Sequence, residues 1–248
     1  MEHAWIHFAA LLLALASGPG APPSLPDPLV LEAPDELPPA PSEYLGRRIA
    51  RTMHWTGAEW LLRETREQEE NTALLLDTLG LRPGMKVADV GCGNGYLTLP
   101  MAEAVGPRGR VWAVDIQVQM ILMLLERARE AGLTNLMPVV CNEIDPGLPA
   151  RELDLVILVD VYHEVGYPEQ LLQRVRESLA PGGHLVLVEF RLEDPNVPIK
   201  RLHKMSKEQI ERELGANGYV LGWSFDGLPW QHVMAFRRDD DPAPEDGR

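Results

Sequence analysis

The amino-acid sequence predicts an α/β protein in which a mostly parallel sheet carries helices on both faces. Two observations support this prediction. Short β-rich runs alternate with amphipathic helical patterns between Lys86 and Phe236, and repeated strand–helix alternation is typical of a doubly wound sheet. The runs are also apolar throughout rather than at every second residue, as in strands that are covered on both faces.

Five of these runs are expected to form the parallel part of the sheet, with helices between them. The strands are predicted at Lys86–Val90, Val111–Asp115, Met137–Val140, Leu153–Val159 and His184–Glu189. The helices are predicted at Tyr96–Ala104, Val118–Ala131 and Glu169–Leu179. The segment 180–183 reads Ala-Pro-Gly-Gly, and its Pro-Gly pair predicts a turn before the fifth strand.

The two ends of the domain complete the expected fold. A capping box begins at Ser206 and predicts a helix from Lys207 to about Asn217. Two further strands, Tyr219–Ser224 and Val233–Phe236, are expected to form an antiparallel hairpin at the edge of the sheet. Upstream of the first strand, Ala58–Leu79 predicts one long helix across the mouth of the sheet, with the charged run RETREQEE as its solvated face.

Composition and charge exclude several classes of protein. The chain has 248 residues, of which 45% are hydrophobic and 24% charged, so a fibrous or fully disordered protein is excluded. Its formal net charge of −14 repels phosphate backbones and anionic lipid headgroups, which argues against nucleic acid as a partner. Cys92 and Cys141 cannot build a disulfide framework, and no Cys/His cluster has the spacing of a structural zinc site.

The chain is expected to divide into four parts. Residues 1–16 resemble a signal peptide, because the apolar run Phe8–Ala16 ends at a small-x-small site and is too short for a stable membrane span. Residues 17–42 hold nine of the 22 prolines and predict an extended linker. Residues 43–238 form the folded domain, and 239–248 an acidic disordered tail. Export to the periplasm or envelope is therefore expected, with an uncleaved N-terminus on a cytoplasmic protein as the alternative.

A glycine-rich loop marks the expected ligand site. Asp89-Val90-Gly91-Cys92-Gly93-Asn94-Gly95 ends the first predicted strand and precedes a helix. Glycines there allow the backbone to approach a ligand closely, at the sheet edge where ligands of open α/β sheets bind. Asp115 closes the second strand 22 residues after Gly93, where an acid can accept hydrogen bonds from ribose hydroxyls. The dinucleotide fingerprint G-x-G-x-x-G requires its third glycine five residues after the first, and here Tyr96 occupies that position. The observed spacing G-x-G-x-G therefore favours a smaller nucleotide ligand.

At these motifs the chain resembles the class I S-adenosylmethionine-dependent methyltransferases, which have a Rossmann-like sheet. The segments VADVGCGNGYLT, VWAVDIQ, LDLVILVDVYHE and LAPGGHLVLVEF are similar to four family motifs in order. The resemblance covers about Arg82 to Phe190, and its core is similar to the ubiquinone/menaquinone-type enzymes. The segment Arg47–Asn71 and the runs PIKRLHKMS and LPWQH are similar to a bacterial exported or envelope-associated subgroup.

The resemblance implies S-adenosylmethionine as cofactor and a small-molecule acceptor as partner. It implies that the cofactor is bound by the following residues: Asp89, Gly91, Gly93, Gly95, Asp115, Ile116, Asn142 and Asp160. The loop after the fourth strand is expected to face the methyl group, so Asp160, His163 and Glu164 are the candidate catalytic residues, with His163 as the candidate base. His163 could equally serve only to orient the loop.

Aromatic and histidine side chains outside the sheet core are candidates for binding the acceptor. These are His54, Trp55, His203, Trp230 and His232. Asp160, His163, Glu164 and His203 could hold a divalent metal ion if they converged, but no local ligand spacing supports this, so no metal is predicted. Oligomeric state is not indicated.

Two other functions compete with methyl transfer. One is a nicotinamide-dependent oxidoreductase, which the missing third glycine opposes. The other is a cofactor-binding module without turnover. Export also conflicts with the methyltransferase prediction, because S-adenosylmethionine is scarce outside the cytoplasm.

Overall fold

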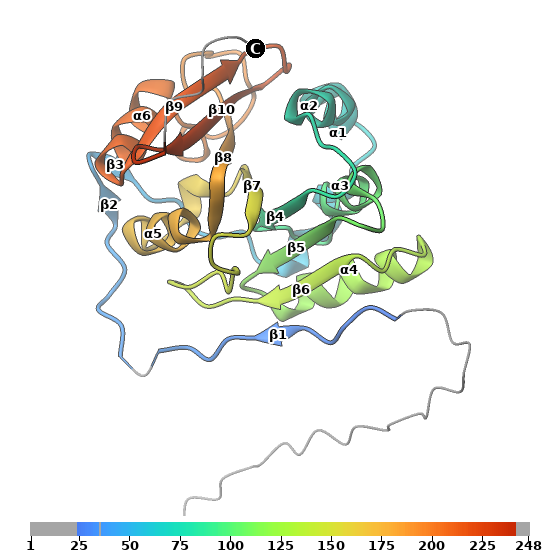
Figure 1. The fold of residues 1–248 in the computed structure, drawn as a ribbon. Coiled ribbons are helices and arrows are strands. Elements are labelled where there is room, and N and C mark those ends of the chain that lie inside the picture. Colours follow the sequence, from blue (N-terminus) through green and yellow to red (C-terminus); the bar gives the residue numbers. More distant parts are fainter. Residues whose placement is uncertain (1–23, 35, 242–248) are drawn as a thin grey trace, which may run out of the picture.

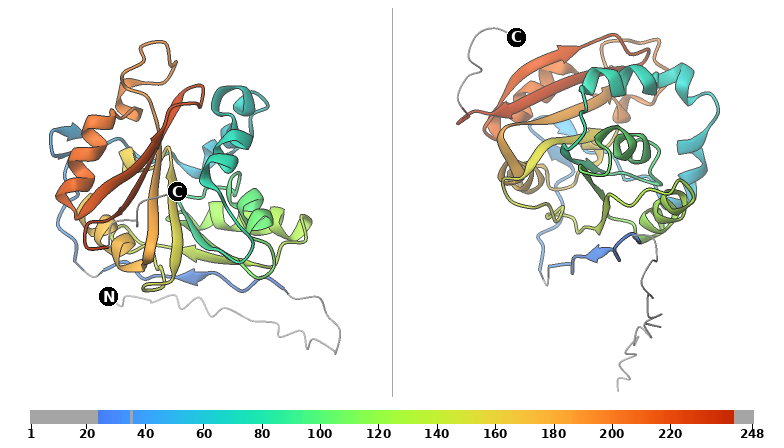
Figure 2. Two further views of the ribbon diagram at one scale, coloured as in Figure 1. Left: turned by 45° about the horizontal axis from the view of Figure 1, so that its top comes forward. Right: turned by 45° about the vertical axis from the view of Figure 1, so that its right-hand side comes forward.

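In a computed structural model, described for residues 24–34 and 36–241, an eight-stranded sheet carries helices on both faces (Figures 1 and 2). Its strands are β1 (Leu29–Val30), β4 (Lys86–Val90), β5 (Arg110–Asp115), β6 (Leu136–Val140), β7 (Leu153–Val159), β8 (Leu179–Phe190), β9 (Tyr219–Phe225) and β10 (Gln231–Arg238). A separate two-stranded ribbon joins β2 (Glu43–Tyr44) to β3 (Arg47–Arg48). The expected signal peptide, residues 1–16, lies outside the described residues.

The strand order confirms the predicted doubly wound sheet. Across the sheet the strands run β1-β6-β5-β4-β7-β8-β10-β9. Strand β4 pairs in parallel with both β5 and β7, so the order of the chain reverses at β4. The last two strands are antiparallel, with β10 between β8 and β9, as predicted for the edge hairpin. In such a sheet the ligand crevice lies at the carboxyl ends of the strands beside the reversal.

Alternation along the strands builds one core on each face. Val87 and Ile157 belong to a cluster with helices α2 (Thr72–Leu79), α3 (Thr98–Val105) and α4 (Val118–Glu130). Their neighbours Ala88 and Val156 belong to the opposite cluster, with helices α5 (Pro168–Ser178) and α6 (Lys207–Ala216). Because consecutive side chains point to opposite faces, continuously apolar strands are buried on both sides.

The predicted long helix over 58–79 is wrong. The segment instead forms a 3-10 helix, η1 (Trp55–Leu62), and two short helices, α1 (Arg66–Glu70) and α2. Asn71 breaks the helix with a left-handed φ of 51°, and its side chain caps α2 by accepting a hydrogen bond from the N–H of Leu74. Asparagine tolerates this conformation and is a preferred N-cap, so a local helix boundary overrides the amphipathic pattern.

The charged run is only partly the solvated face that was predicted, because Glu64 and Glu67 are exposed but other charges of the run are not. Arg66 and Glu70 are buried and joined at 2.8 Å, and Arg63 pairs with both Glu69 and Glu70 at 2.6 Å. These ion pairs hold the turn between η1 and α1. Asn94 of the glycine loop donates to the carbonyl of Ala58, which fixes η1 over that loop.

The predicted turn at 180–183 lies within β8 as an irregularity. Leu153 pairs with Leu179, whereas Leu155 pairs with His184, so the extra residues of β8 bulge out of the ladder. Gly182 has a φ of 78° there, which is the left-handed conformation that a glycine after proline is expected to adopt in a turn.

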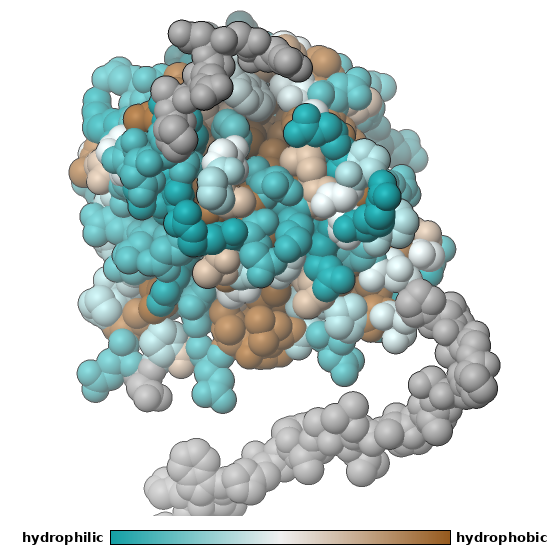
Figure 3. Space-filling model, in the orientation of Figure 1, coloured by the Kyte–Doolittle hydropathy of each residue, from teal (hydrophilic) through white to brown (hydrophobic). Residues whose placement is uncertain are grey.

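Parts of both predicted flexible ends are ordered. Leu29 and Val30 of the proline-rich segment add a short parallel strand to β6, although their side chains are 51% and 61% exposed. Figure 3 shows hydrophobic residues gathered at the lower edge of an otherwise mostly hydrophilic face, in the region of β1. In the predicted tail, Asp239 pairs with Arg176 and Asp241 with Arg238; residues 242–248 lie outside the described part.

A buried ion pair anchors the segment before η1 to the domain. Arg47 of β3 pairs with Glu213 of α6 at 2.7 Å, and the Glu213 side chain is fully buried. Arg47 also donates to the backbone carbonyl of His163 at 2.9 Å, as does the N–H of Ala50 at 3.0 Å. The N-terminal segment thereby fixes the loop after β7. Among the described residues, no helix has the length and apolar character that a membrane crossing requires.

Candidate active site

A cavity of about 720 Å³ lies at the carboxyl ends of β4, β5 and β7. Its walls come from the glycine loop after β4, the loops after β5, β6, β7 and β8, and the N-terminal cap, which comprises residues 52–70 with η1 and α1. This volume falls in the range of roughly 300–1,000 Å³ that is usual for small-molecule sites. The sheet therefore places its ligand crevice where the sequence predicted it.

The glycines of the loop serve two different purposes. Gly91 and Gly93 line the cavity with φ values of 76° and 54°. A Cβ atom on Gly91 would lie 2.5 Å from Cγ2 of Val161, so this position admits no side chain. Gly95 has a φ of 84°, and a Cβ there would clash with Leu99 and Leu124. Gly95 therefore lets helices pack against the loop, and it is not among the cavity-lining residues.

Asp115 holds the glycine loop from the end of β5. Its Oδ2 accepts a hydrogen bond from the N–H of Gly93 at 2.9 Å, and its Oδ1 accepts one from Gln117 at 2.8 Å. Burial raises the pKa of Asp115, although these backbone hydrogen bonds counteract the effect. Asp115 lines the cavity together with its neighbour Ile116, whose side chain is 43% exposed.

Asp89 and Asn142 also line the cavity, and both have partners within the protein. Asp89 accepts a hydrogen bond from the hydroxyl of Thr98 at 2.6 Å, and burial raises its pKa to about 6. The amide oxygen of Asn142 accepts from the N–H groups of Ile144 and Asp145, and its amide nitrogen donates to Glu32. Asn142 thus shapes the loop after β6.

Asp160 has an unusual position at the end of β7. Its φ of 54° is left-handed, and its Oδ2 accepts a hydrogen bond from Gln231 at 2.7 Å. Its buried Oδ1 has no partner among the residues that the structure describes. Burial, together with the negative charges of Glu70 and Glu189, raises the pKa of Asp160 well above its ordinary value. The site thus offers an acceptor atom that lacks a cation or donor.

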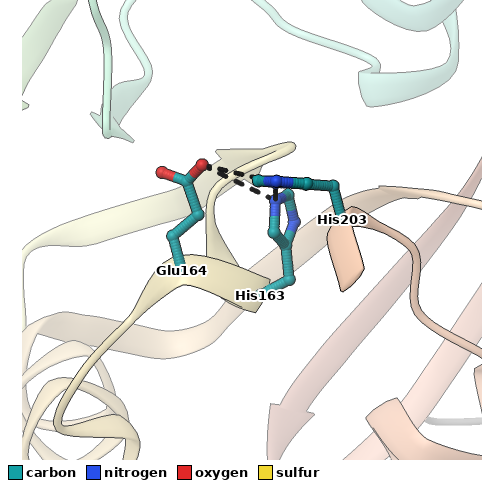
Figure 4. Close-up of side chains that lie close together, drawn as sticks. All are labelled: His163, Glu164 and His203. Carbon is teal, nitrogen blue, oxygen red and sulfur yellow. Dashed lines mark hydrogen bonds and ion pairs between the residues drawn. The ribbon is translucent and has the colours of Figure 1, made fainter. Parts of the chain in front are cut away.

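His163 and Glu164 of η2 (Tyr162–Glu164) meet His203 of η3 (Arg201–His203) at one corner of the cavity (Figure 4). His163 Nδ1 lies 2.7 Å from Oε2 of Glu189, which is fully buried. His163 Nε2 lies 3.1 Å from His203 Nδ1, and Glu164 Oε1 lies 3.8 Å and 3.7 Å from these two nitrogens. Two imidazoles and one carboxylate therefore converge.

Burial and charge perturb each member of this corner. Burial by itself would lower the pKa of His163, but the charge and hydrogen bond of Glu189 raise it overall. Burial raises the pKa of Glu164 to about 7, against the opposing effect of His163. Burial, followed by the charge of His163, lowers the pKa of His203. Perturbed groups of this kind cluster at functional sites.

Only one of the five residues predicted to bind the acceptor, His203, lines this cavity. His54 caps η1, and Trp55 is 37% exposed. Trp230 packs on Phe190 with ring centroids 6.5 Å apart. His232 is buried beside Glu189 in the β8–β10 ladder, and neither ring nitrogen has a partner within the described part of the chain.

The cap contributes cavity residues that sequence reasoning missed. Arg66 lines the cavity and stacks on Tyr96 with its guanidinium carbon 3.9 Å from the ring centroid. Trp60 and Met53 line it from η1 and the segment before it. Nothing in the run RETREQEE distinguishes Arg66 from its neighbours, because tertiary packing decides which charge is buried.

The residues present fit S-adenosylmethionine. The unpartnered Oδ1 of Asp160 suits the ammonium group of an amino acid. Gly91 and Gly93 line the cavity with backbone alone, because a Cβ on either would overlap Val161 or Leu61, and Asp115 offers a carboxylate in the position where ribose is bound in such sheets. The cofactor would thus span the glycine loop from Asp160 to Asp115.

Comparison with known proteins agrees with this fit. A family model described as a methyltransferase domain matches residues 81–234. A ubiquinone/menaquinone biosynthesis C-methyltransferase, UbiE, of Bordetella avium is 32% identical over 128 residues, covering 51% of this chain and 49% of that protein. Aklanonic acid methyltransferase DauC of Streptomyces sp. is 38% identical over 104 residues, covering 41% and 46%. The chain thus matches about half the length of these relatives.

A solved structure shares the fold. The crystal structure of a SAM dependent methyltransferase from Aquifex aeolicus has a TM-score of 0.70 and 22% identity, covering 75% of this chain and 98% of the other. The family match spans more than half of the present chain. It shows that the chain belongs to the methyltransferase domain family, and the cavity described above fits the methyl donor expected from the sequence.

Proposed function

We propose that this enzyme transfers the methyl group of S-adenosylmethionine to a small, largely apolar acceptor with one polar group. The observation that carries the proposal is the division of the cavity. The cradle of Gly91, Gly93, Asp115 and Asp160 occupies one part, and the corner of His163, Glu164 and His203 occupies another. Apolar side chains line much of the remaining wall, among them Trp60, Met53, Ile199 and Phe190.

In the cofactor part, the chain itself supplies binding and orientation. Asp160 would hold the ammonium group through its free Oδ1, and Asp115 would bind the ribose while it keeps the loop closed through Gly93. Arg66 lies near the same end of the cavity, with its side chain fixed by Glu70 and by the carbonyl of Leu61. These residues are positioned before any ligand arrives, which lowers the entropic cost of binding.

S-adenosylmethionine supplies an electrophilic methyl group whose displacement leaves a neutral thioether. The main task of the protein is therefore alignment, and positioning alone can lower the activation barrier by about 7–11 kcal/mol. The loop after β7 supports alignment because Arg47 and Ala50 hold the carbonyl of His163, and Glu189 holds its N–H. The polar group of the acceptor would bind at the corner that this loop presents.

His163 has the geometry of a group that accepts a proton or binds a polar atom. Its Nδ1 faces the carboxylate of Glu189 at 2.7 Å, so in the neutral ring this contact favours the proton on Nδ1 and leaves the lone pair on Nε2. Its role as catalytic base stays a prediction, as do the catalytic roles of Asp160 and Glu164. The methylated atom is an oxygen, nitrogen or carbon of the acceptor.

The experiment is an acceptor screen with a matched variant. The purified chain is incubated with S-adenosylmethionine and a panel of phenols, quinols and polyketide-like hydroxyls, and formation of S-adenosylhomocysteine is measured. Turnover with at least one acceptor that is lost in Asp115→Ala supports the proposal. Tight cofactor binding without turnover on any acceptor would instead favour the binding module. NAD binding in preference to S-adenosylhomocysteine would favour the oxidoreductase.

The cellular location belongs to the same proposal. The apolar run before residue 17 supports export. Membership of the exported subgroup stays a prediction, which rests on the segment Arg47–Asn71 and the runs PIKRLHKMS and LPWQH. N-terminal sequencing of the native protein together with cell fractionation tests it. An intact N-terminus in the cytoplasmic fraction would contradict export and would remove the conflict with cofactor supply.

A further inference from the structure

We propose that His163, Glu164 and His203 form a binding site for a divalent transition-metal ion of the zinc class. The three ligand atoms are Nε2 of His163, Nδ1 of His203 and Oε1 of Glu164. They come from two segments that lie 40 residues apart in the sequence, and Figure 4 shows all three side chains turned toward one point. Neither the sequence pattern nor the methyl transfer reaction requires this convergence.

The separations between the three atoms match a shared metal ion. They form a triangle with sides of 3.1, 3.8 and 3.7 Å. The circle through the corners of such a triangle has a radius of about 2.1 Å, and zinc lies roughly 2.0–2.2 Å from histidine nitrogens and carboxylate oxygens. One ion can therefore contact all three atoms without movement of the backbone.

A buried carboxylate prepares His163 for this role. The 2.7 Å contact with Glu189 Oε2 keeps the ring proton on Nδ1 and directs the lone pair of Nε2 toward His203 and Glu164. Metal-bound histidines commonly donate their second ring N–H to a carboxylate in this way. Glu189 also accepts from the backbone N–H of His163, so the ring and its backbone are fixed together.

The local charge favours a cation. Glu164 and Glu189 contribute two carboxylates, and the nearby guanidinium of Arg47 is engaged by Glu213. A dication between His163 and His203 would also replace the 3.1 Å contact between Nε2 of His163 and Nδ1 of His203, in which one ring nitrogen has to donate a proton to the other. These features distinguish the corner from a group of exposed acids, since His163 is 2% exposed.

The site is open on the side of the cavity. Three protein ligands leave at least one coordination position for water or a ligand, which is the arrangement of catalytic rather than structural metal sites. All three residues line the cavity, so this position faces the space where the acceptor is proposed to bind. This part of the inference rests on the proposed function. The acceptor is then an oxygen compound, such as a phenol or enol, whose hydroxyl the metal would bind and acidify.

The test uses the full chain after removal of metal by a chelator, without any cofactor or acceptor. Zn²⁺ is titrated by calorimetry, and Co²⁺ is titrated by visible absorption, which reports the coordination geometry. We expect one ion per chain with a Kd on the order of 1 μM or tighter. His203→Gln changes a partly exposed residue and should weaken binding by more than about 100-fold.

Two further variants and a control complete the test. Glu189→Gln should weaken metal binding by about 10- to 100-fold by releasing the ring of His163. His184→Gln, at the far end of β8 and outside the cavity lining, is the matched control and should bind as wild type does. The proposal is overturned if wild type shows no site tighter than about 100 μM, or if His203→Gln and Glu164→Gln bind Zn²⁺ like wild type.

This outcome is separate from the test of methyl transfer. Metal binding is read without cofactor, and cofactor binding is read by titration with S-adenosylhomocysteine in the presence of chelator. A chain that binds Zn²⁺ but not S-adenosylhomocysteine would retain the metal site and lose the proposed function. A chain that binds S-adenosylhomocysteine but not Zn²⁺ would keep the proposed function and lose the metal site.

Discussion

Replacing Asp160 with asparagine should weaken cofactor binding and at the same time stabilise the protein. Asparagine tolerates the left-handed φ of 54°, and its amide oxygen can still accept the hydrogen bond from Gln231. The variant therefore keeps the local fold. It removes the negative charge whose burial raises the pKa of Asp160.

The two effects have opposite signs and separate magnitudes. Loss of a charge-assisted hydrogen bond to the ammonium group costs about 1.5–3 kcal/mol, which corresponds to about 10- to 150-fold in Kd. The asparagine NH2 group takes the unpartnered position of Oδ1, so the gain comes only from removing the buried charge beside Glu70 and Glu189, and it should add about 1–3 kcal/mol to the free energy of unfolding. For a domain of this size that raises Tm by at least about 2 °C.

Calorimetric titration with S-adenosylhomocysteine measures the first effect, and thermal denaturation without ligand measures the second. Asp77→Asn is the control, because Asp77 is exposed on α2 and forms no ion pair within the described residues. A variant at position 160 that binds S-adenosylhomocysteine within threefold of wild type, or that melts below wild type, would refute the reasoning. The control should change neither quantity.

Three further changes test the packing and electrostatics around the site. Gly91→Ala should destabilise the protein by about 2–5 kcal/mol in urea denaturation, because of the φ of 76° and the overlap of the new Cβ with Val161. Adding Val161→Ala should recover about 1–3 kcal/mol. A double variant that is no more stable than Gly91→Ala would contradict the overlap. Asp89→Asn should gain stability over wild type as pH rises from about 4 to 7. The raised pKa of Asp89, about 6, makes wild type lose up to about 3 kcal/mol across that range, so a constant difference in Tm from pH 4 to 7 would count against it. Glu213→Ala should cost about 3–5 kcal/mol because it leaves Arg47 buried without its partner, and a loss below 1 kcal/mol in the same denaturation assay would argue against this anchor.

The sequence predicted those parts of the site that depend on local pattern. The glycine loop follows an apolar strand and precedes a helix, so strand periodicity and turn chemistry together place Gly91, Gly93 and Asp115 at one edge of the sheet. The loop after β7 was located by the same argument, since parallel neighbouring strands end at the same edge. The fold class and the edge hairpin were confirmed for this reason.

Features set by contacts between distant segments were not predictable in this way. The helix expected over 58–79 is broken at Asn71, where a single cap outweighs the amphipathic pattern. Arg66 is buried because the cap folds over the glycine loop, and no residue near Arg66 signals this. Leu29 and Val30 pair with β6, more than 100 residues away, although a proline-rich segment predicts an unpaired chain.

The histidines show the same limit most clearly. His163 and His203 occupy the same corner only because the segment after β8 returns over the cavity, which residue spacing cannot reveal. Trp230 and His232 were grouped with the acceptor site for their residue types, yet the position of β10 between β8 and β9 places them away from the cavity lining.

Titration of the purified chain with S-adenosylhomocysteine, followed by the same titration of Asp115→Ala, is the most direct measurement of how the crevice is used. A single site in wild type that is weakened at least tenfold by the substitution, with no heat from NAD, is the expected result. Wild type that binds NAD but not S-adenosylhomocysteine, or a variant whose affinity is unchanged, would contradict the assignment of the crevice to an adenosyl methyl donor.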